Sequence, residues 1–360
     1  MIFNTWTFGL FLLVFFIIYW LVLKPEWRPY GLLMASLAFY IYYAASYTLL
    51  ILLLSLFVYG SSRLLLKLRY SHTCPSKGSL KAAGKNNVFK NPLVVLWLSI
   101  TVCVLVLGYY KYSGFLASTL NDILAAIKSG KSLAVPEILV PLGLSYFIFE
   151  FIHYLVDSYY GRTKGATLLE FGIFALFFPT KVAGPIKRFQ PFAKQLRNRI
   201  TYKPEFLTKG LWRIVTGLAK KVLVADIIGV YALPLTNFSN NPDVSPFILW
   251  LAVYAYAIRI YFDFSGYSDI AIGCAKLFGF EVPENFNKPY LRQNIAEFWR
   301  NWHMSLTSWL MDYIYMPLGK KLMPSIGKNH PLLRIINELL NGYAFLQNNE
   351  NSSSDGFQRV

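Results

Sequence analysis

Residues 261–320 read YFDFSGYSDIAIGCAKLFGFEVPENFNKPYLRQNIAEFWRNWHMSLTSWLMDYIYMPLGK, and this stretch decides the fold. It begins with an apolar segment that carries carboxylates and continues through a polar turn rich in proline and asparagine. A predicted helix follows, with a single histidine among tryptophans. The sequence before this stretch alternates between long apolar blocks and short polar breaks, which predicts a helical membrane scaffold.

The composition indicates a membrane protein. Hydrophobic residues make up 55% of the 360-residue chain and charged residues 15%, whereas soluble domains have roughly 25% charged residues. Several apolar blocks approach the roughly 20 residues that cross a bilayer as a helix. We therefore predict an all-α, polytopic integral membrane protein. The formal charge of +17 does not indicate a nucleic-acid partner, because the basic residues lie mostly in loops between apolar blocks.

The distribution of charge predicts the direction of each crossing. Residues 61–90 contain only basic charged residues, so this loop is predicted to be cytoplasmic and residues 114–135 to form an external polar segment. Residues 168–179 are too short to cross, and we expect a re-entrant segment that needs protein or a water-filled cavity around it. The first crossing lacks a basic leader and a cleavage site and is expected to be retained. The predicted crossings are residues 5–23, 30–59, 93–112, 136–160, 222–235 and 247–277.

A strongly basic stretch covers residues 181–221, where Glu205 is the single acid. One interpretation is a solvated cytoplasmic face near anionic lipid. The other is a docking surface for an anionic donor or its acidic carrier. The cysteines Cys74, Cys103 and Cys274 lack the spacing of a disulfide framework or a zinc site, and we predict no metal site.

Ionisable residues inside predicted crossings are candidates for function. Glu150, His153 and Asp157 share one helical face, as either a self-satisfied polar stripe or a cavity-lining proton relay. Arg259 and Asp263 are four residues apart and are expected to neutralise each other. Asp269 has no such partner in its own helix and follows small residues that permit close helix packing, so it is the stronger candidate.

The predicted helix after Pro289 starts near Ile295, because Asn294 and Glu297 form a capping pattern. His303 would share a face with Trp299 and Arg300, and an imidazole among apolar neighbours can stay neutral, as a general base must. The alternative is a buried histidine that only hydrogen-bonds a neighbouring helix. Asp312 would lie on the opposite face. Hydrolase-elbow, phosphate-loop and HExxH motifs are missing from the sequence.

Five ordered blocks resemble the membrane-bound O-acyltransferases, in the bacterial branch of alginate O-acetyltransferases and teichoic-acid D-alanyl transferases. The blocks are PLGLSYFIFEFIHYLVDSYYG (141–161), FFPTKVAGPIKRFQPF (177–192), GLWRIVTGLAKKVLVAD (210–226), YFDFSGYSDIAIG (261–273) and ENFNKPYLRQNIAEFWRNWHMSLTSWLMDYIYMPLG (284–319). The resemblance implies helices and re-entrant segments around a central funnel in residues 1–320. His303 then falls at the first motif histidine, the predicted catalytic residue, with Asp269, Trp299, Arg300 and Asp312 as funnel candidates.

The implied reaction moves an acyl group, with acetyl favoured, from a cytoplasmic thioester to hydroxyls of an exported polysaccharide. Acetyl-CoA or an acyl carrier protein would be the co-substrate, with no tightly bound cofactor. Membrane lipid, the polysaccharide and an extracytoplasmic acetyltransferase are the expected partners. The expected location is the bacterial inner membrane, with several crossings.

The sequence departs from the family pattern after residue 320. The second histidine of the family, in a stretch like GLWHG, has no counterpart, and His330 is expected to be a loop residue. Residues 321–360 are predicted to be an atypical, partly disordered tail, and the acyltransferase domain to be incomplete at its C-terminus. D-alanyl transfer to teichoic acid, a truncated non-catalytic membrane subunit and a lipid-linked sugar transporter remain alternatives.

Overall fold

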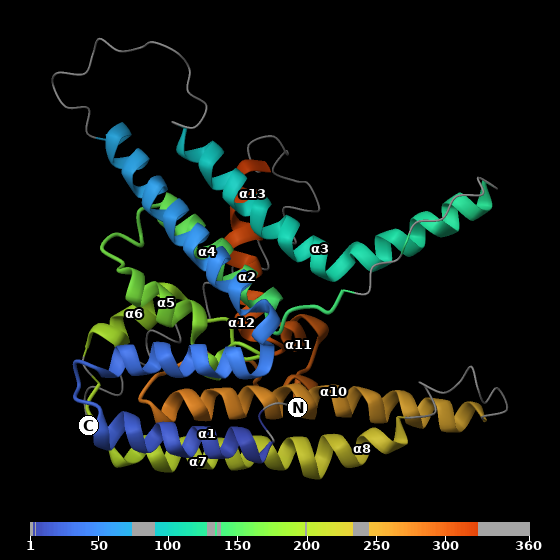
Figure 1. Cartoon of the computed structure of the whole chain (residues 1–360). Coiled ribbons are helices and arrows are strands. Elements are labelled where there is room, and N and C mark those ends of the chain that lie inside the picture. The colour runs from blue at the N-terminus through green and yellow to red at the C-terminus, as the bar shows by residue number, and fades with distance from the viewer. Residues whose placement is uncertain are drawn as a thin grey trace. The chain divides into compact units, whose positions relative to one another are not determined.

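The computed structural model describes residues 5–73, 91–127, 138–198, 200–232 and 245–322, together with residues 3 and 134. The chain divides into two compact units, Met1–Ser305 and Leu306–Val360. Both units are helical in these ranges, where no β-strand occurs beyond one isolated bridge. The predicted all-α fold is confirmed (Figure 1).

Three helices of the described ranges are long and apolar enough to cross a membrane. They are α2 (Arg28–Thr73), α3 (Pro92–Ala126) and α10 (Pro246–Leu277). Large apolar side chains along them, such as Leu105 and Trp250, are well exposed. Such faces are suited to lipid rather than water. The chain is therefore a multi-pass membrane protein.

The first helix, α1 (Trp6–Ile17), continues as the π-helical turn η2 (Ile18–Val22). The indole N–H of Trp20 donates a hydrogen bond to the Leu277 carbonyl at 2.9 Å, which joins this turn to the end of α10. Helix α2 bends at Ala44, where φ is −149° and ψ is 46°.

Helix α3 is longer than the predicted crossing at residues 93–112. It continues to Ala126, so the first part of the expected external polar segment is helical instead. Leu116, Leu120 and Ile123 recur there at helical spacing, and this periodicity outweighs the mild polarity of the segment.

Helix α4 (Leu144–Tyr159) is shorter than the crossing predicted at residues 136–160. Gly143 precedes it with a φ of 69°, and a Cβ there would lie 2.1 Å from the Lys181 carbonyl oxygen. Only glycine fits this combination of left-handed backbone and close approach. The helix therefore starts at residue 144.

The short apolar segment after α4 does not cross, in agreement with its predicted length. Helix α5 (Leu168–Leu176) begins at a capping box formed by Thr167 and Glu170 and ends in the 3-10 turn η4 (Phe178–Thr180). Its inner residues are buried among other side chains. Helix α6 (Phe189–Arg197) follows.

Helices α7 (Pro204–Ala219) and α8 (Asp226–Tyr231), joined by the π-helical turn η5 (Lys220–Ala225), run alongside α10 (Figure 1). Their backbones meet α10 at glycines. A Cβ on Gly217 would lie 2.5 Å from the Gly266 carbonyl oxygen, and one on Gly273 would lie 2.7 Å from that of Gly210. The close packing expected around residues 264–268 is thus present. The basic residues 209–221 lie on α7 and η5 and not in a loop.

The chain then forms the 3-10 turn η7 (Pro289–Leu291), α11 (Ile295–Asn301) and α12 (Met304–Leu310), within which the boundary between the two units falls. The second unit contains η8 (Met311–Tyr315) and α13 (Met316–Leu322). Cys74, His330 and the predicted tail beyond residue 322 lie outside the described residues.

Candidate functional site

The helix predicted to carry His303 is broken at that residue. Helix α11 ends at Asn301, and the extended residue Trp302 forms a β-bridge with Phe286. His303 then has a φ of 46°, in the left-handed region. The prediction of one continuous helix was wrong, because the turn before α11 provides another hydrogen-bond partner for the backbone. The Met304 N–H donates to the Asn285 carbonyl of that turn at 2.9 Å. The expected helix start at Ile295, with Asn294 accepting the Glu297 N–H, is confirmed.

Asn285 fixes this turn from a fully buried position. Its side-chain amide donates to the Ser268 hydroxyl on α10 at 3.1 Å. Its Oδ1 accepts from the Ser305 hydroxyl at 2.6 Å, and that hydroxyl in turn accepts the Ile186 N–H at 3.0 Å. The residues on both sides of His303 are therefore tied to the same turn: Trp302 bridges Phe286, and Met304 and Ser305 both bond to Asn285.

The imidazole of His303 packs edge-on against Phe264, with ring centroids 4.8 Å apart at an angle of 80°. Its Nε2 is buried and has no hydrogen-bond partner among the described residues. Burial lowers the pKa of His303 to about 4, so the ring is neutral near pH 7. A neutral imidazole whose nitrogen has no hydrogen-bond partner can accept a proton from a hydroxyl that reaches it.

Asp269 is buried but not alone. Arg213 donates to it at 2.7 Å and Lys220 at 2.6 Å, both from the α7–η5 layer. Arg213 also pairs with Glu284. Sequence inspection of one helix could not find these partners, since they come from another. The charge of Asp269 is therefore compensated, and its carboxylate lines a pocket of about 300 Å³ together with Glu284 and Tyr261.

The remaining predicted site residues do not share a helical face with His303. Trp299 and Arg300 lie on α11, which ends before His303, and the Trp299 side chain is 56% exposed. Asp312 lies on η8 of the second unit. Asp263 pairs with Lys221 at 2.7 Å, so the expected neutralisation by Arg259 was wrong.

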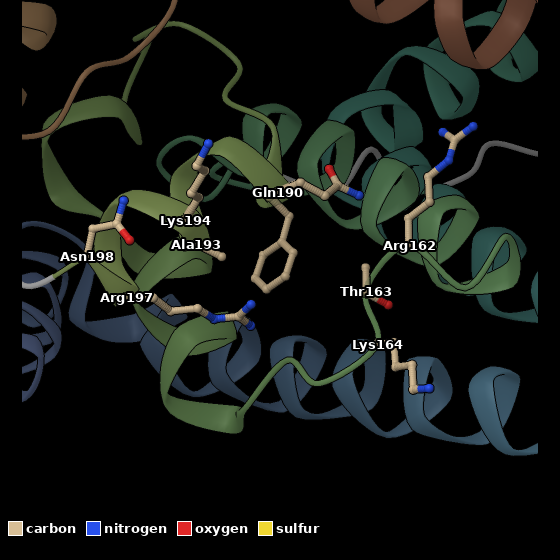
Figure 2. Close-up of a pocket in the computed structure, with 9 residues that line it drawn as sticks. Arg162, Thr163, Lys164, Gln190, Ala193, Lys194, Arg197 and Asn198 are labelled. Atoms are coloured by element: carbon tan, nitrogen blue, oxygen red, sulfur yellow. The ribbon is translucent and has the colours of Figure 1, made fainter.

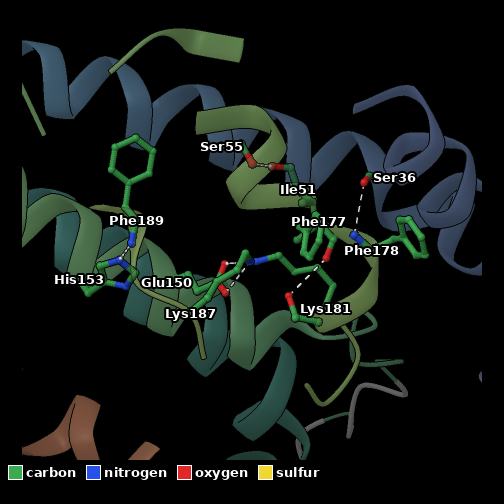
Figure 3. Close-up of polar contacts among 11 residues, drawn as sticks. Ser36, Ile51, Ser55, Glu150, His153, Phe177, Phe178, Lys181, Lys187 and Phe189 are labelled. Atoms are coloured by element: carbon green, nitrogen blue, oxygen red, sulfur yellow. Dashed lines mark hydrogen bonds and ion pairs between the residues drawn. The ribbon is translucent and has the colours of Figure 1, made fainter. Parts of the chain in front are cut away.

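The polar stripe of α4 is satisfied by the segment after η4 and not by itself (Figure 3). Glu150 binds the ammonium groups of Lys181 and Lys187, the latter at 2.9 Å. His153 accepts the Phe189 N–H at 3.3 Å through Nε2. The charged side chains of Glu150, Lys181 and Lys187 are almost fully buried. Lys181 and Lys187 are therefore no part of a solvated basic face, contrary to that interpretation of residues 181–221.

Aromatic rings enclose this buried cluster of Glu150, Lys181 and Lys187. The ammonium of Lys181 lies 4.4 Å from the Phe147 ring centroid, and that of Lys187 lies 4.6 Å from the Phe174 centroid. Burial lowers the pKa of Lys187 to about 7, because the loss of hydration outweighs the attraction of Glu150, and the charge of Lys181 lowers it as well. The signal in the sequence was Glu150 itself, because a carboxylate in a crossing needs a cationic partner.

Comparison with known proteins identifies the family. The model of the membrane-bound O-acyltransferase family matches residues 37–330. The probable alginate O-acetylase AlgI of Pseudomonas aeruginosa is 36% identical over 311 residues, which is 86% of this chain and 55% of that protein. The peptidoglycan O-acetyltransferase of Helicobacter pylori is 29% identical over 82% of this chain and 56% of its own length.

A more distant likeness links the chain to the teichoic acid D-alanyltransferase of Bacillus subtilis, 34% identical over 49% of this chain and 45% of that protein. The chain spans about half the length of the curated relatives it matches. The family match covers both the buried Glu150 cluster and the His303 turn. The chain belongs to the membrane-bound O-acyltransferase family.

Proposed function

We propose that the chain transfers an acetyl group from a thioester to a hydroxyl of an exported polysaccharide, with His303 as the general base. The observation that carries this proposal is the His303 turn, where a neutral, buried and unpartnered Nε2 is presented by a strained backbone. Acetylation is favoured over D-alanylation because the alginate and peptidoglycan acetyltransferases match far more of the chain than the D-alanyltransferase does.

In the proposed step, Nε2 of His303 accepts the proton of the acceptor hydroxyl as its oxygen attacks the thioester carbonyl carbon. The carbon–sulfur bond breaks, an ester bond forms, and the proton passes from the imidazolium to the departing thiolate. General-base assistance of this kind contributes roughly 10²- to 10⁴-fold to a rate. The thioester, acetyl-CoA or an acylated carrier protein, is a co-substrate on the cytoplasmic side of the bacterial inner membrane.

The function is tested with the full chain in proteoliposomes. Radiolabelled acetyl-CoA or an acetylated carrier protein is supplied with alginate, peptidoglycan fragments or teichoic acid, and ester-linked label on the glycan is counted. Label on a polysaccharide is the expected result. Incorporation only from a D-alanyl carrier would overturn acetyl transfer, and absence of label with every donor and acceptor would overturn the enzymatic function. An extracytoplasmic acetyltransferase, the proposed partner, is added as a separate arm.

A further inference from the structure

A pocket of about 180 Å³ lies between the turn that follows α4 and the helix α6 (Figure 2). Its floor is formed by the buried residues Phe189 and Ala193. Arg162 and Lys164 stand on the turn, and Lys194 and Arg197 stand on α6, with Arg197 reaching toward the gap between the two segments. The lining contains these four cations and no acidic residue.

Carboxylates pair with the two arginines of the pocket but, among the described residues, not with its two lysines. Arg162 pairs with Asp157 at 3.1 Å, and Arg197 pairs with Glu170 at 2.5 Å. No carboxylate pairs with Lys164 or Lys194 anywhere in the described part of the chain. The pocket therefore has a net positive charge on two exposed and movable side chains, which favours an anionic ligand.

The surroundings of the pocket are those of a membrane interface. Basic residues begin on α2 at Arg63 and recur at Lys67 and Arg69, while α4 ends at Tyr159. Arg69 joins the two helices by donating to the Tyr159 carbonyl at 2.6 Å. The Lys164 ammonium lies 4.8 Å from the Tyr70 ring centroid, and the Arg162 guanidinium lies 5.3 Å from that of Tyr160. Exposed tyrosines beside basic residues are typical of the level of lipid headgroups.

We propose that this pocket binds the phosphate group of an anionic phospholipid. The phosphate oxygens would contact Lys164 and Lys194, while the exposed ring of Tyr160, which lies beside Arg162, would lie against the lipid's glycerol and acyl region. Phosphate oxygens form strong charge-assisted hydrogen bonds with such donors. The site shares no lining residue with the pocket beside Asp269, and the proposal does not depend on the acyl-transfer activity.

The test measures the affinity of the purified full chain in detergent for dioctanoyl phosphatidylglycerol, with dioctanoyl phosphatidylcholine and glycerol 3-phosphate as comparison ligands. The variant is Lys164→Gln with Lys194→Gln, two exposed positions whose replacement leaves the buried contacts intact. Its matched control is Lys203→Gln with Lys209→Gln, exposed lysines of the same basic stretch outside the pocket. Gel filtration checks that each variant keeps the wild-type oligomeric size.

Phosphatidylglycerol is expected to bind the wild type and the Lys203/Lys209 double variant with equal affinity. It is expected to bind the Lys164/Lys194 double variant roughly 10- to 30-fold more weakly. Binding should weaken as salt rises, because the lysines are exposed. Equal affinity in all three proteins, or equal affinity for phosphatidylcholine, would overturn the site. Glycerol 3-phosphate binding as tightly as the lipid would overturn the lipid as the ligand and assign the pocket to a soluble phosphate ester.

Discussion

The backbone of His303 has a φ of 46°, a left-handed conformation that costs a non-glycine residue roughly 1–2 kcal/mol. Such strain persists only where the surroundings over-determine it. Here the buried Asn285 supplies three hydrogen bonds to the turn and its neighbours. We interpret the strain as the means by which Nε2 of His303 is presented without a protein partner.

Variants of Asn285 should show whether this residue positions His303 or contributes to substrate binding. In Asn285→Ala the Ser268 and Ser305 hydroxyls lose their partner, and the turn relaxes. Because a displacement of about 1 Å can cost roughly 10²-fold in rate, we expect kcat to fall by about that factor with little change in KM. Asn285→Asp keeps an acceptor for the Ser305 hydroxyl, so its kcat should lie between those of the wild type and Asn285→Ala.

Steady-state kinetics of acetyl transfer measure this effect, and the melting temperature of Asn287→Ala, an exposed neighbour, is the stability control. A variant that raises KM at unchanged kcat would show that Asn285 does not position His303.

The pKa of His303 also predicts a dependence of stability on pH. Burial lowers this pKa from 6.5 to about 4, so the unfolded chain binds more protons between these values. The free energy of unfolding should therefore fall as the pH is lowered from 6.5 to 4. Below pH 4, His303 should contribute no further change. The melting temperature of the wild type should fall relative to that of His303→Gln as the pH is lowered across this window. Parallel curves would contradict a buried neutral imidazole.

The buried cluster of Glu150, Lys181 and Lys187 predicts opposite effects for its members. Glu150→Gln leaves two buried ammonium groups without a carboxylate, which should destabilise the protein by roughly 3–5 kcal/mol. Lys187→Met removes the surplus charge and keeps the volume and the contacts with the phenylalanines, so its effect should be near zero or stabilising. Thermal unfolding in detergent measures both. A larger loss in Lys187→Met than in Glu150→Gln would show that the second lysine is not surplus.

At the level of elements, the contact between α7 and α10 depends on paired glycines. A Cβ on Gly217 would lie 2.5 Å from the Gly266 carbonyl oxygen, whereas one on Gly108 in α3 meets nothing within 4 Å. Alanine favours a helix over glycine by roughly 1 kcal/mol, so Gly108→Ala should be neutral or stabilising. Gly217→Ala should lower the melting temperature despite the same gain, because the two backbones must separate. Equal melting temperatures for the two variants would contradict this close contact.

The long apolar block of α10 was predicted well, whereas α2 continues to Thr73, beyond the predicted crossing at residues 30–59 and into the predicted loop. Other errors occurred where backbone from a distant segment intervened. The turn at Asn285 breaks the helix around His303, and Gly143 shortens α4 against the Lys181 carbonyl. Neither effect has a local signal, because the competing groups are separated in the sequence from the residues they alter.

For the candidate site, the sequence identified His303 and Glu150 but not their surroundings. Residue type and the family motif suffice to select an imidazole, whereas its neutral state depends on burial by Phe264 and neighbouring residues. The sequence gives Asp269 no partner, because helical spacing reports only contacts within one helix. Its partners Arg213 and Lys220 belong to a different layer.

At the scale of the whole molecule, the long helices expose apolar surfaces, while three carboxylates on α4 and α10 are paired with cations of other segments. Glu150, Asp263 and Asp269 each bind a cation from another segment. A protein that spans a membrane must satisfy such groups internally, because lipid offers them no partners. The family match over residues 37–330 covers all three pairs.

The most direct test of the account is the initial rate of acetyl transfer by His303→Ala in proteoliposomes, measured beside the wild type and with added imidazole. The rate of His303→Ala is expected to fall by roughly 10²- to 10⁴-fold, with an unchanged melting profile at pH 7 and partial recovery in imidazole. A rate equal to that of the wild type would contradict the central claim that His303 is the general base.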